Sequence, residues 1–255
     1  MYPILHLEIE ELILDLLAED DEDLSALKTC SLVCHAFLPI CRKHIFENIV
    51  LNAHNSFSSN IHAFERLVRE TPEIADYVRK LDYTIRNSDL TSSPILESLK
   101  RVSRLEFLRI RRQGWNTKFA RRNSPIRPAL LHLLHLPTLT HLKLSEIEDF
   151  VASDLIPCVN LRYLDIGIYM SGAYETTFPA VFPKHSIHLN EFLAGIRTSV
   201  LIMKLCKAQR PDGQPIINFG SLSRIAVVYD DRNERALQEL FRHCPFLTFV
   251  DINCK

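Results

Sequence analysis

The stretch LEFLRI, residues 105–110, has a leucine at its first and fourth positions and an isoleucine at its sixth. The same apolar spacing recurs in LTHLKL (139–144), LRYLDI (161–166), LSRIAV (222–227) and LTFVDI (247–252), and more weakly in VRKLDY (78–83) and LNEFLA (189–194). Apolar residues at alternating positions predict a short β-strand with one buried face. Because successive copies begin 22 to 34 residues apart, the chain is predicted to repeat one structural unit.

Segments with helical character separate several of these copies. They are PILESLKR (94–101), RPALLHLLHL (127–136), SVLIMKLCKA (199–208) and RALQELFRHC (235–244). One short strand and one helix per unit, at an irregular period, predict an α/β fold of the leucine-rich-repeat type, a solenoid with short parallel strands. An ordinary α/β fold with leucine in its strands is the alternative. The chain has only six glycines, which disfavours a nucleotide-binding fold built on a glycine loop.

The first fifty residues have a different pattern. Apolar residues at positions 9, 12, 13, 16 and 17 form one stripe of an amphipathic helix. The acids from Glu19 to Asp23 predict the end of this helix, Asp23 is a candidate cap for a second helix, and Pro39 marks the start of a third. We therefore expect a three-helix module over residues 1–52 and a repeat domain over 53–255. Three short helices bury little core, so the module is expected to pack against another surface.

The sequences LHLEIEELILDLL (5–17) and DLSALKTCSLVCHAFLPICRKHIFENIVL (23–51) resemble the F-box of proteins from mushroom-forming fungi. The opening Leu-Pro-x-Glu-Leu of that family corresponds to residues 5–9, and its Leu-Val-Cys-Arg-x-Trp-Leu-Pro run corresponds to residues 32–39. Three positions depart from the family pattern. His6 replaces the proline, His35 replaces the arginine and Phe37 replaces the tryptophan.

The resemblance implies a substrate-recruiting subunit of an SCF-type cullin-RING ubiquitin ligase. An F-box of this type docks on a Skp-family adaptor, and through it on a cullin scaffold, while the repeats behind it bind a protein substrate. No catalysis and no cofactor are implied. By matching position, the adaptor contact is expected at Leu5, Leu7, Ile9, Leu12, Ile13, Leu16, Leu24, Leu27, Leu32, Val33 and Phe37.

The polar positions between the strand leucines are expected to line the binding face of the repeats. Residues 107–145 contain eight lysines and arginines and no acid. We therefore expect an acidic or phosphorylated substrate segment to lie across Phe107, Arg109, His141, Lys143 and Tyr163.

The basic segment from Arg109 to Arg127 also contains Trp115 and Phe119. A solvated loop is the favoured interpretation, and binding of an acidic or phosphorylated protein is the next. Nucleic acid is the least favoured ligand, because the net charge of the whole chain is only −1. Two alternative functions stay open: a leucine-rich-repeat scaffold independent of the ubiquitin ligase, and, less favoured, a nucleic-acid-binding repeat protein.

Cys30, Cys34, Cys41 and His44 recur at helical spacings that could bring four zinc ligands together. Packing is the favoured interpretation, because cysteine is often a small buried apolar residue and no C-x-x-C pair occurs. His132 and His135 lack the spacing of a metal-binding helix, and no nucleophile motif is present. We expect neither a metal site nor an enzyme.

Hydrophobic residues make up 47% of the chain and charged residues 24%, and no apolar run is long enough to span a membrane. The first residues lack the basic region of a secretory signal. These features predict a cytoplasmic or nuclear protein with reduced cysteines and no membrane partner. The last strand, LTFVDI, is expected at the end of the chain without a polar capping unit.

Overall fold

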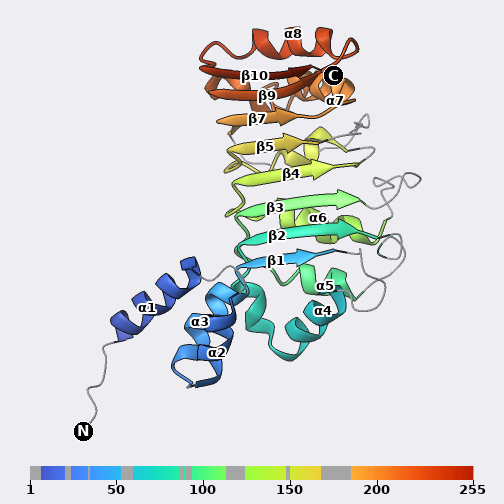
Figure 1. Ribbon diagram of the computed structural model, residues 1–255. Helices are drawn as coiled ribbons and strands as arrows, with labels where there is room; N and C mark the ends of the chain where they lie inside the picture. The colour runs from blue at the N-terminus through green and yellow to red at the C-terminus, as the bar shows by residue number, and fades with distance from the viewer. Residues whose placement is uncertain are drawn as a thin grey trace.

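A computed structural model of the chain describes residues 7–20, 24–33, 35–52, 60–86, 89, 94–112, 124–147, 150–167 and 185–254. The protein is α/β, and its main feature is an eight-stranded parallel sheet in which the strand order follows the order of the chain. The strands lie one above another from β1 to β10 in Figure 1. They are β1 (Asn48–Leu51), β2 (Lys80–Ile85), β3 (Phe107–Arg112), β4 (His141–Ser145), β5 (Tyr163–Ile166), β7 (Glu191–Ala194), β9 (Arg224–Tyr229) and β10 (Phe249–Cys254). β6 (Ile187–His188) and β8 (Ile217–Asn218) form a separate two-stranded parallel sheet.

Seven of the eight main strands coincide with the seven copies of the sequence pattern, and each begins at the third position of its copy. β1 was not predicted: Phe46, Ile49 and Leu51 have the apolar spacing of the other copies, but phenylalanine replaces the leading aliphatic residue and the segment was assigned to the N-terminal module. β1 pairs with β2 from Asn48 opposite Lys80 to Leu51 opposite Tyr83. The sheet therefore begins within the first 52 residues.

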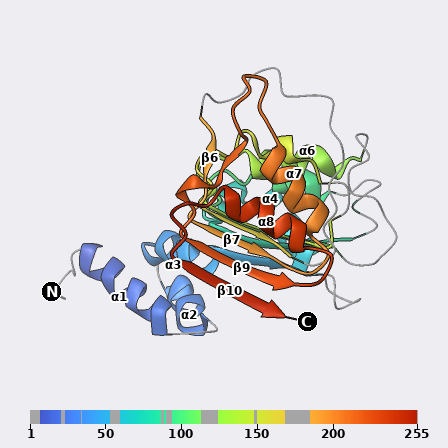
Figure 2. The ribbon, with the colours of Figure 1, turned by 90° about the horizontal axis from the view of Figure 1, so that it is seen from above.

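Helices α4, α6, α7 and α8 lie on one side of the sheet in Figure 2. Their bounds, with those of the short α5, are α4 (Asn60–Glu70), α5 (Ile95–Leu99), α6 (Ile126–Leu134), α7 (Ser199–Lys207) and α8 (Glu234–Arg242). Among the elements that the structure describes in full, 3-10 helices occur at η1 (Pro72–Asp76), η3 (Ala152–Leu155) and η4 (Phe219–Ser221). The four helical segments expected from the sequence coincide with α5, α6, α7 and α8, although α6 and α8 each begin one residue earlier than expected. Helices α4, α6, α7 and α8 thus cover one face of the sheet, and the polar positions of the strands line the other.

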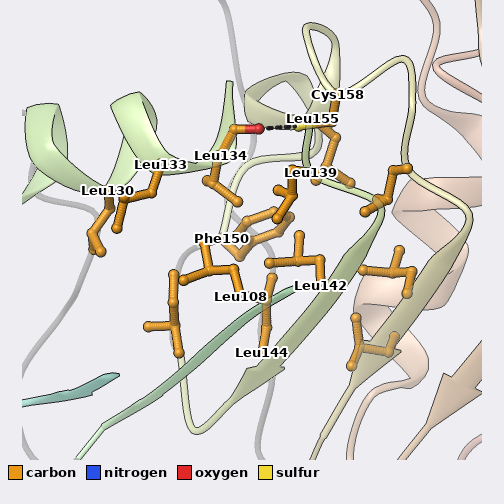
Figure 3. Close-up of a cluster of buried hydrophobic side chains, with 14 of the residues drawn as sticks. Leu108, Leu130, Leu133, Leu134, Leu139, Leu142, Leu144, Phe150, Leu155 and Cys158 are labelled. Carbon is orange, nitrogen blue, oxygen red and sulfur yellow. Dashed lines mark hydrogen bonds between the residues drawn. The ribbon is translucent and has the colours of Figure 1, made fainter. Parts of the chain in front are cut away.

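The leucines of the sequence pattern form the core between the sheet and its helices. Leu108, Leu142 and Leu144 are buried on the sheet side. Figure 3 shows them facing the α6 leucines at 130, 133 and 134. The buried thiol of Cys158 donates a hydrogen bond to the carbonyl oxygen of Leu134, 3.1 Å away. Burial raises the pKa of this thiol to about 12, which leaves it a neutral core group.

The N-terminal residues form three helices, as expected. They are α1 (Leu7–Asp20), α2 (Ser25–Val33) and α3 (Phe37–Ile45), and they lie beside the β1 end of the sheet in Figure 1. α3 begins at Phe37 rather than at Pro39, because the first turn of a helix tolerates a residue without an N–H group. The proposed cap Asp23 lies outside the described residues. A small hydrophobic cluster of Leu14, Leu27, Ile40 and Cys41 holds these helices together.

The buried carboxylate of Asp89 is hydrogen-bonded to a residue of β2 and to the residue that follows β2 in the sequence. Asp89 Oδ2 accepts hydrogen bonds from the hydroxyl of buried Tyr83 at 2.7 Å and from the backbone N–H of Arg86 at 3.0 Å. Its Oδ1 accepts a bond from the Arg86 guanidinium at 2.9 Å. Burial by itself raises the pKa of Asp89, but these hydrogen bonds outweigh it and hold the pKa below its usual range.

Asp89→Asn is expected to lower the free energy of unfolding at neutral pH by about 1–3 kcal/mol, because Arg86 and Tyr83 lose a charged acceptor. The pKa of Asp89 in the folded protein lies below its unfolded value of about 3.9. The stabilisation is therefore complete above that value and is lost as the pH falls through the folded-state pKa. Urea unfolding of wild type and variant at neutral and acidic pH measures the difference in their free energies of unfolding. This difference should become smaller at acidic pH. A difference in the free energy of unfolding that does not change with pH would contradict stabilisation by the ionised carboxylate of Asp89.

Candidate protein-binding surfaces

The register of the sheet brings all five predicted substrate-binding residues together. Phe107 lies opposite His141, and His141 lies opposite Tyr163, on three neighbouring strands. Arg109 lies opposite Lys143 in the next row. Neighbouring strands are about 4.8 Å apart, so residues of one row are in contact distance although they are far apart in sequence.

The first row, which consists of Phe107, His141 and Tyr163, is a line of aromatic rings across three strands, and we call it the aromatic column. The rings of His141 and Tyr163 are stacked with their centroids 5.4 Å apart, and the ring of Phe107 is 6.4 Å from that of His141. The ammonium group of Lys143 lies 5.2 Å from the centroid of Tyr163 and 5.9 Å from that of Phe107. Such cation–π contacts hold the lysine against the rings and leave an apolar strip beside a positive charge.

The second row also contains two acids, Asp82 and Asp165, which were not expected to form ion pairs with its basic residues. Asp82 on β2 accepts a hydrogen bond from Arg111 at 3.0 Å and lies 3.6 Å from Arg109. Asp165 on β5 lies 3.7 Å from the Lys143 ammonium. Burial raises the pKa of Asp165, and the positive charges of Lys143 and Arg109 oppose this rise. The expected basic face is therefore a surface of mixed charge.

We call this surface the sheet-face ladder. Its residues are Asp82, Phe107, Arg109, Arg111, His141, Lys143, Tyr163 and Asp165. The Nε atoms of Arg109 and Arg111 are buried and have no hydrogen-bond partner among the described residues. The two side chains are 41% and 32% exposed, so their guanidinium groups can donate further hydrogen bonds to an acceptor oxygen from outside. The ladder thus offers N–H donors beside an aromatic column, an arrangement suited to an acidic side chain or a phosphate.

Other residues singled out in the sequence have structural contacts. Arg127 forms an ion pair with Asp154 at 2.6 Å on the helix side of the sheet, away from the sheet-face ladder. The Nε2 atoms of His132 and His135 lie 2.9 Å and 3.2 Å from the carbonyl oxygens of Val102 and Asp154. These histidines connect neighbouring units. Trp115, Phe119 and the rest of residues 113–123 lie outside the described residues.

The second surface lies on the first two helices. On α1, Leu14 is buried, whereas Leu12 is 58% exposed. On α2, Leu32 is 87% exposed at the last turn. We call this surface the N-terminal apolar face. Its six large exposed side chains are Ile9, Leu12, Ile13, Leu16, Leu32 and Val33, all of them predicted adaptor contacts.

The remaining predicted adaptor contacts are placed differently. Leu27 is fully buried in the N-terminal cluster, so its assignment to a docking surface is wrong: it is the one residue of α2 whose side chain lies inside that cluster. Leu24 and Phe37 are partly buried and pack against the same cluster. Leu24 also has a backbone φ of 57°, which turns the chain into α2. Leu5 and the side chain of Leu7 lie outside the described residues.

An ion pair fixes α1 against α3. The imidazole Nε2 of His44 lies 2.7 Å from Asp15 Oδ1, and the ammonium of Lys43 lies 3.8 Å from the same oxygen. His44, considered above as a zinc ligand, thus holds two helices together. Cys41 is buried and Cys30 packs against the same cluster, in agreement with a packing role, while Cys34 lies outside the described residues. Within the described part of the chain, no three histidine, cysteine, aspartate or glutamate side chains are grouped to hold a metal ion.

No protein-family model matches the sequence, and no curated protein matches it significantly. Among the helices that the structure describes, none is both long and apolar enough to cross a bilayer. The functional proposal therefore depends on the two surfaces and on the residues that form them.

Proposed function

We propose that this chain is a substrate-recruiting subunit of an SCF-type cullin-RING ubiquitin ligase and is not itself an enzyme. The N-terminal apolar face docks on a Skp-family adaptor, which connects the chain to a cullin. The sheet-face ladder, on strands that follow the leucine-rich-repeat pattern, binds a protein substrate. Such a subunit acts in the cytoplasm or the nucleus.

One observation carries the proposal. The N-terminal apolar face exposes six large apolar side chains on a three-helix unit whose own hydrophobic cluster has four buried members among the described residues. Burying apolar area is worth about 25 cal/mol per Å², so a partner that covers this face gains substantial free energy. The same residues occupy the positions at which the sequence resembles an F-box. The exposed stripe therefore supports docking on a protein partner.

The departures from the F-box pattern favour a second candidate, a repeat scaffold that does not bind the ligase. Phe37, which stands at the position of the family tryptophan, packs partly against the N-terminal cluster. His35, at the position of the family arginine, is exposed. In a scaffold, the N-terminal apolar face would bind a different partner. A nucleic-acid-binding repeat protein is less well supported, since acids accompany the basic groups of the sheet-face ladder.

Affinity purification of the tagged full chain, followed by mass spectrometry, separates the first two candidates. Recovery of a Skp-family adaptor together with a cullin is the expected result. If established F-box proteins retain the adaptor under the same conditions and this chain does not, the scaffold is the better assignment. Retention on RNA or DNA that falls with salt would favour the nucleic-acid candidate.

The sheet-face ladder has its own test. Arg109→Glu combined with Lys143→Glu is expected to reduce substrate capture about tenfold or more, because a row of four neighbouring acids would replace the present ion pairs and repel an acidic segment. Arg224→Glu is the matched control, since Arg224 also pairs with an acid across two strands, Glu191 at 3.7 Å, but lies outside the ladder. Quantitative mass spectrometry of the purified complexes measures the loss. Equal substrate recovery with both variants would contradict a role of the ladder.

A further inference from the structure

A cavity of about 620 Å³ lies on the helix side of the sheet, away from the sheet-face ladder. It lies between α7, the start of α8, η3 and the segment that leads into β8, and Figure 2 shows α7 and α8 side by side there. Small-molecule sites in proteins usually have volumes of about 300–1,000 Å³. The size of this cavity suits a small molecule with an extended apolar part.

The floor of the cavity is apolar. Val151, Ile216 and Ala236 line it and are buried. Val200 and Met203 extend the apolar surface along α7, and Val200 is 56% exposed. An exposed valine beside a buried apolar floor is a position that an apolar ligand would cover.

The rim of the cavity is basic. Lys204 and Lys207 follow Met203 on α7, Arg232 lies just before α8, and Arg235 is in the first turn of α8. Lys207, Arg232 and Arg235 are exposed, and none of the lining residues is an acid. Four positive charges therefore surround one apolar floor.

The rim charges differ from those of neighbouring basic residues. Arg210 pairs with Asp212 at 2.8 Å, and Arg242 pairs with Glu239 at 2.9 Å. By contrast, Lys207, Arg232 and Arg235 form no ion pair with any other residue that the structure describes. These three exposed side chains, which form no ion pair within the described part of the chain, can therefore turn toward an anion.

We propose that this cavity binds a free amphiphilic anion, a long-chain carboxylate such as a fatty acid. The alkyl chain lies along Val151, Val200 and Met203, and the carboxylate meets the rim cations. A guanidinium of the rim can bind the carboxylate in a bidentate manner. The site is independent of the proposed adaptor and substrate surfaces, since it shares no residue with either.

Calorimetric titration of the full chain tests the proposal, with dodecanoate kept below its micelle concentration as the probe. Saturable binding at one site per chain is expected. Acetate, which has the headgroup alone, and dodecyl maltoside, a neutral amphiphile, should bind at least about tenfold more weakly. Equal binding of dodecyl maltoside, or no binding of dodecanoate, would overturn the proposal.

Variants distinguish the cavity from general association. Lys207→Glu combined with Arg235→Glu should weaken dodecanoate binding about tenfold or more, because the headgroup then meets acids. Arg69→Glu on α4, an exposed basic residue on a different helix, is the control and should bind dodecanoate like wild type. Thermal unfolding confirms that each variant is folded. Wild-type affinity in the double variant would overturn the proposal, as would binding to anionic-lipid vesicles without binding to monomeric dodecanoate.

Discussion

Leu12→Asp combined with Leu32→Asp is expected to weaken binding of a Skp-family adaptor about 100-fold or more. Both side chains are more than half exposed, one on α1 and one on α2. Burying a leucine is worth about 1.5–3 kcal/mol, so the loss of two contacts exceeds the roughly 2.8 kcal/mol that corresponds to 100-fold. Each new carboxylate would also be buried without a partner in the complex, which adds to the loss.

Purified adaptor and the full chain, titrated by calorimetry or surface plasmon resonance, give this comparison. Phe246→Asp is the matched control, because Phe246 is 73% exposed but lies between α8 and β10, at the opposite end of the sheet. The double variant should unfold at the same temperature as wild type, since neither leucine is in the N-terminal cluster. Unchanged adaptor affinity in a folded double variant would show that the N-terminal apolar face is not the docking surface.

Phe192→Ala is expected to lower the free energy of unfolding by about 3–5 kcal/mol, the usual range for truncating a buried phenylalanine. Phe192 on β7 is fully buried. Its ring meets that of Phe219 edge to face, with the centroids 5.8 Å apart and the planes at 77°. Truncation removes this pair and leaves a cavity between the sheet and η4, so both the lost burial and the cavity contribute.

Phe249→Ala provides the contrast. Phe249 begins β10, is 50% exposed, and lies under the guanidinium of Arg224 at 5.0 Å from the ring centroid. Losing an exposed cation–π contact costs about 0.5–1 kcal/mol. Urea unfolding of both variants measures the difference. If both substitutions lowered the free energy of unfolding equally, Phe192 and Phe249 would not differ in burial in solution, contrary to the structure.

The pattern of leucines predicted the strands correctly, because burial on one face of a strand leaves a period of two in the sequence. It also placed Phe107, His141 and Tyr163 on the opposite face, where the structure has them. The prediction missed β1, where Phe46, Ile49 and Leu51 keep the apolar spacing but an aromatic residue takes the first position. It could not find the cavity between α7 and α8, because residues from four separate segments line that cavity.

At the N-terminus, periodicity identified the apolar residues of each helix but not which of them face inward. Ile9, Leu12, Ile13 and Leu16 are exposed although they form the apolar stripe of α1, while Leu14 between them is buried. Leu27 was expected at the surface and is in the core. A helix of this length has apolar residues on several sides, and only the positions of its neighbours decide which side is covered.

The apolar periodicity of the sequence was enough to predict seven strands of the main sheet, helices α5 to α8 and the rows of side chains on the open face of the sheet, but not β1, α4, β6 or β8. The tertiary structure decided how the charges on that face are paired. Lys143 meets Asp165, its register partner on the next strand, and Arg111 reaches diagonally across to Asp82, 29 residues away, whose own register partner is Arg109. Hydrophobic burial leaves a periodic trace along the chain, whereas an ion pair between strands depends on a register that exists only after folding.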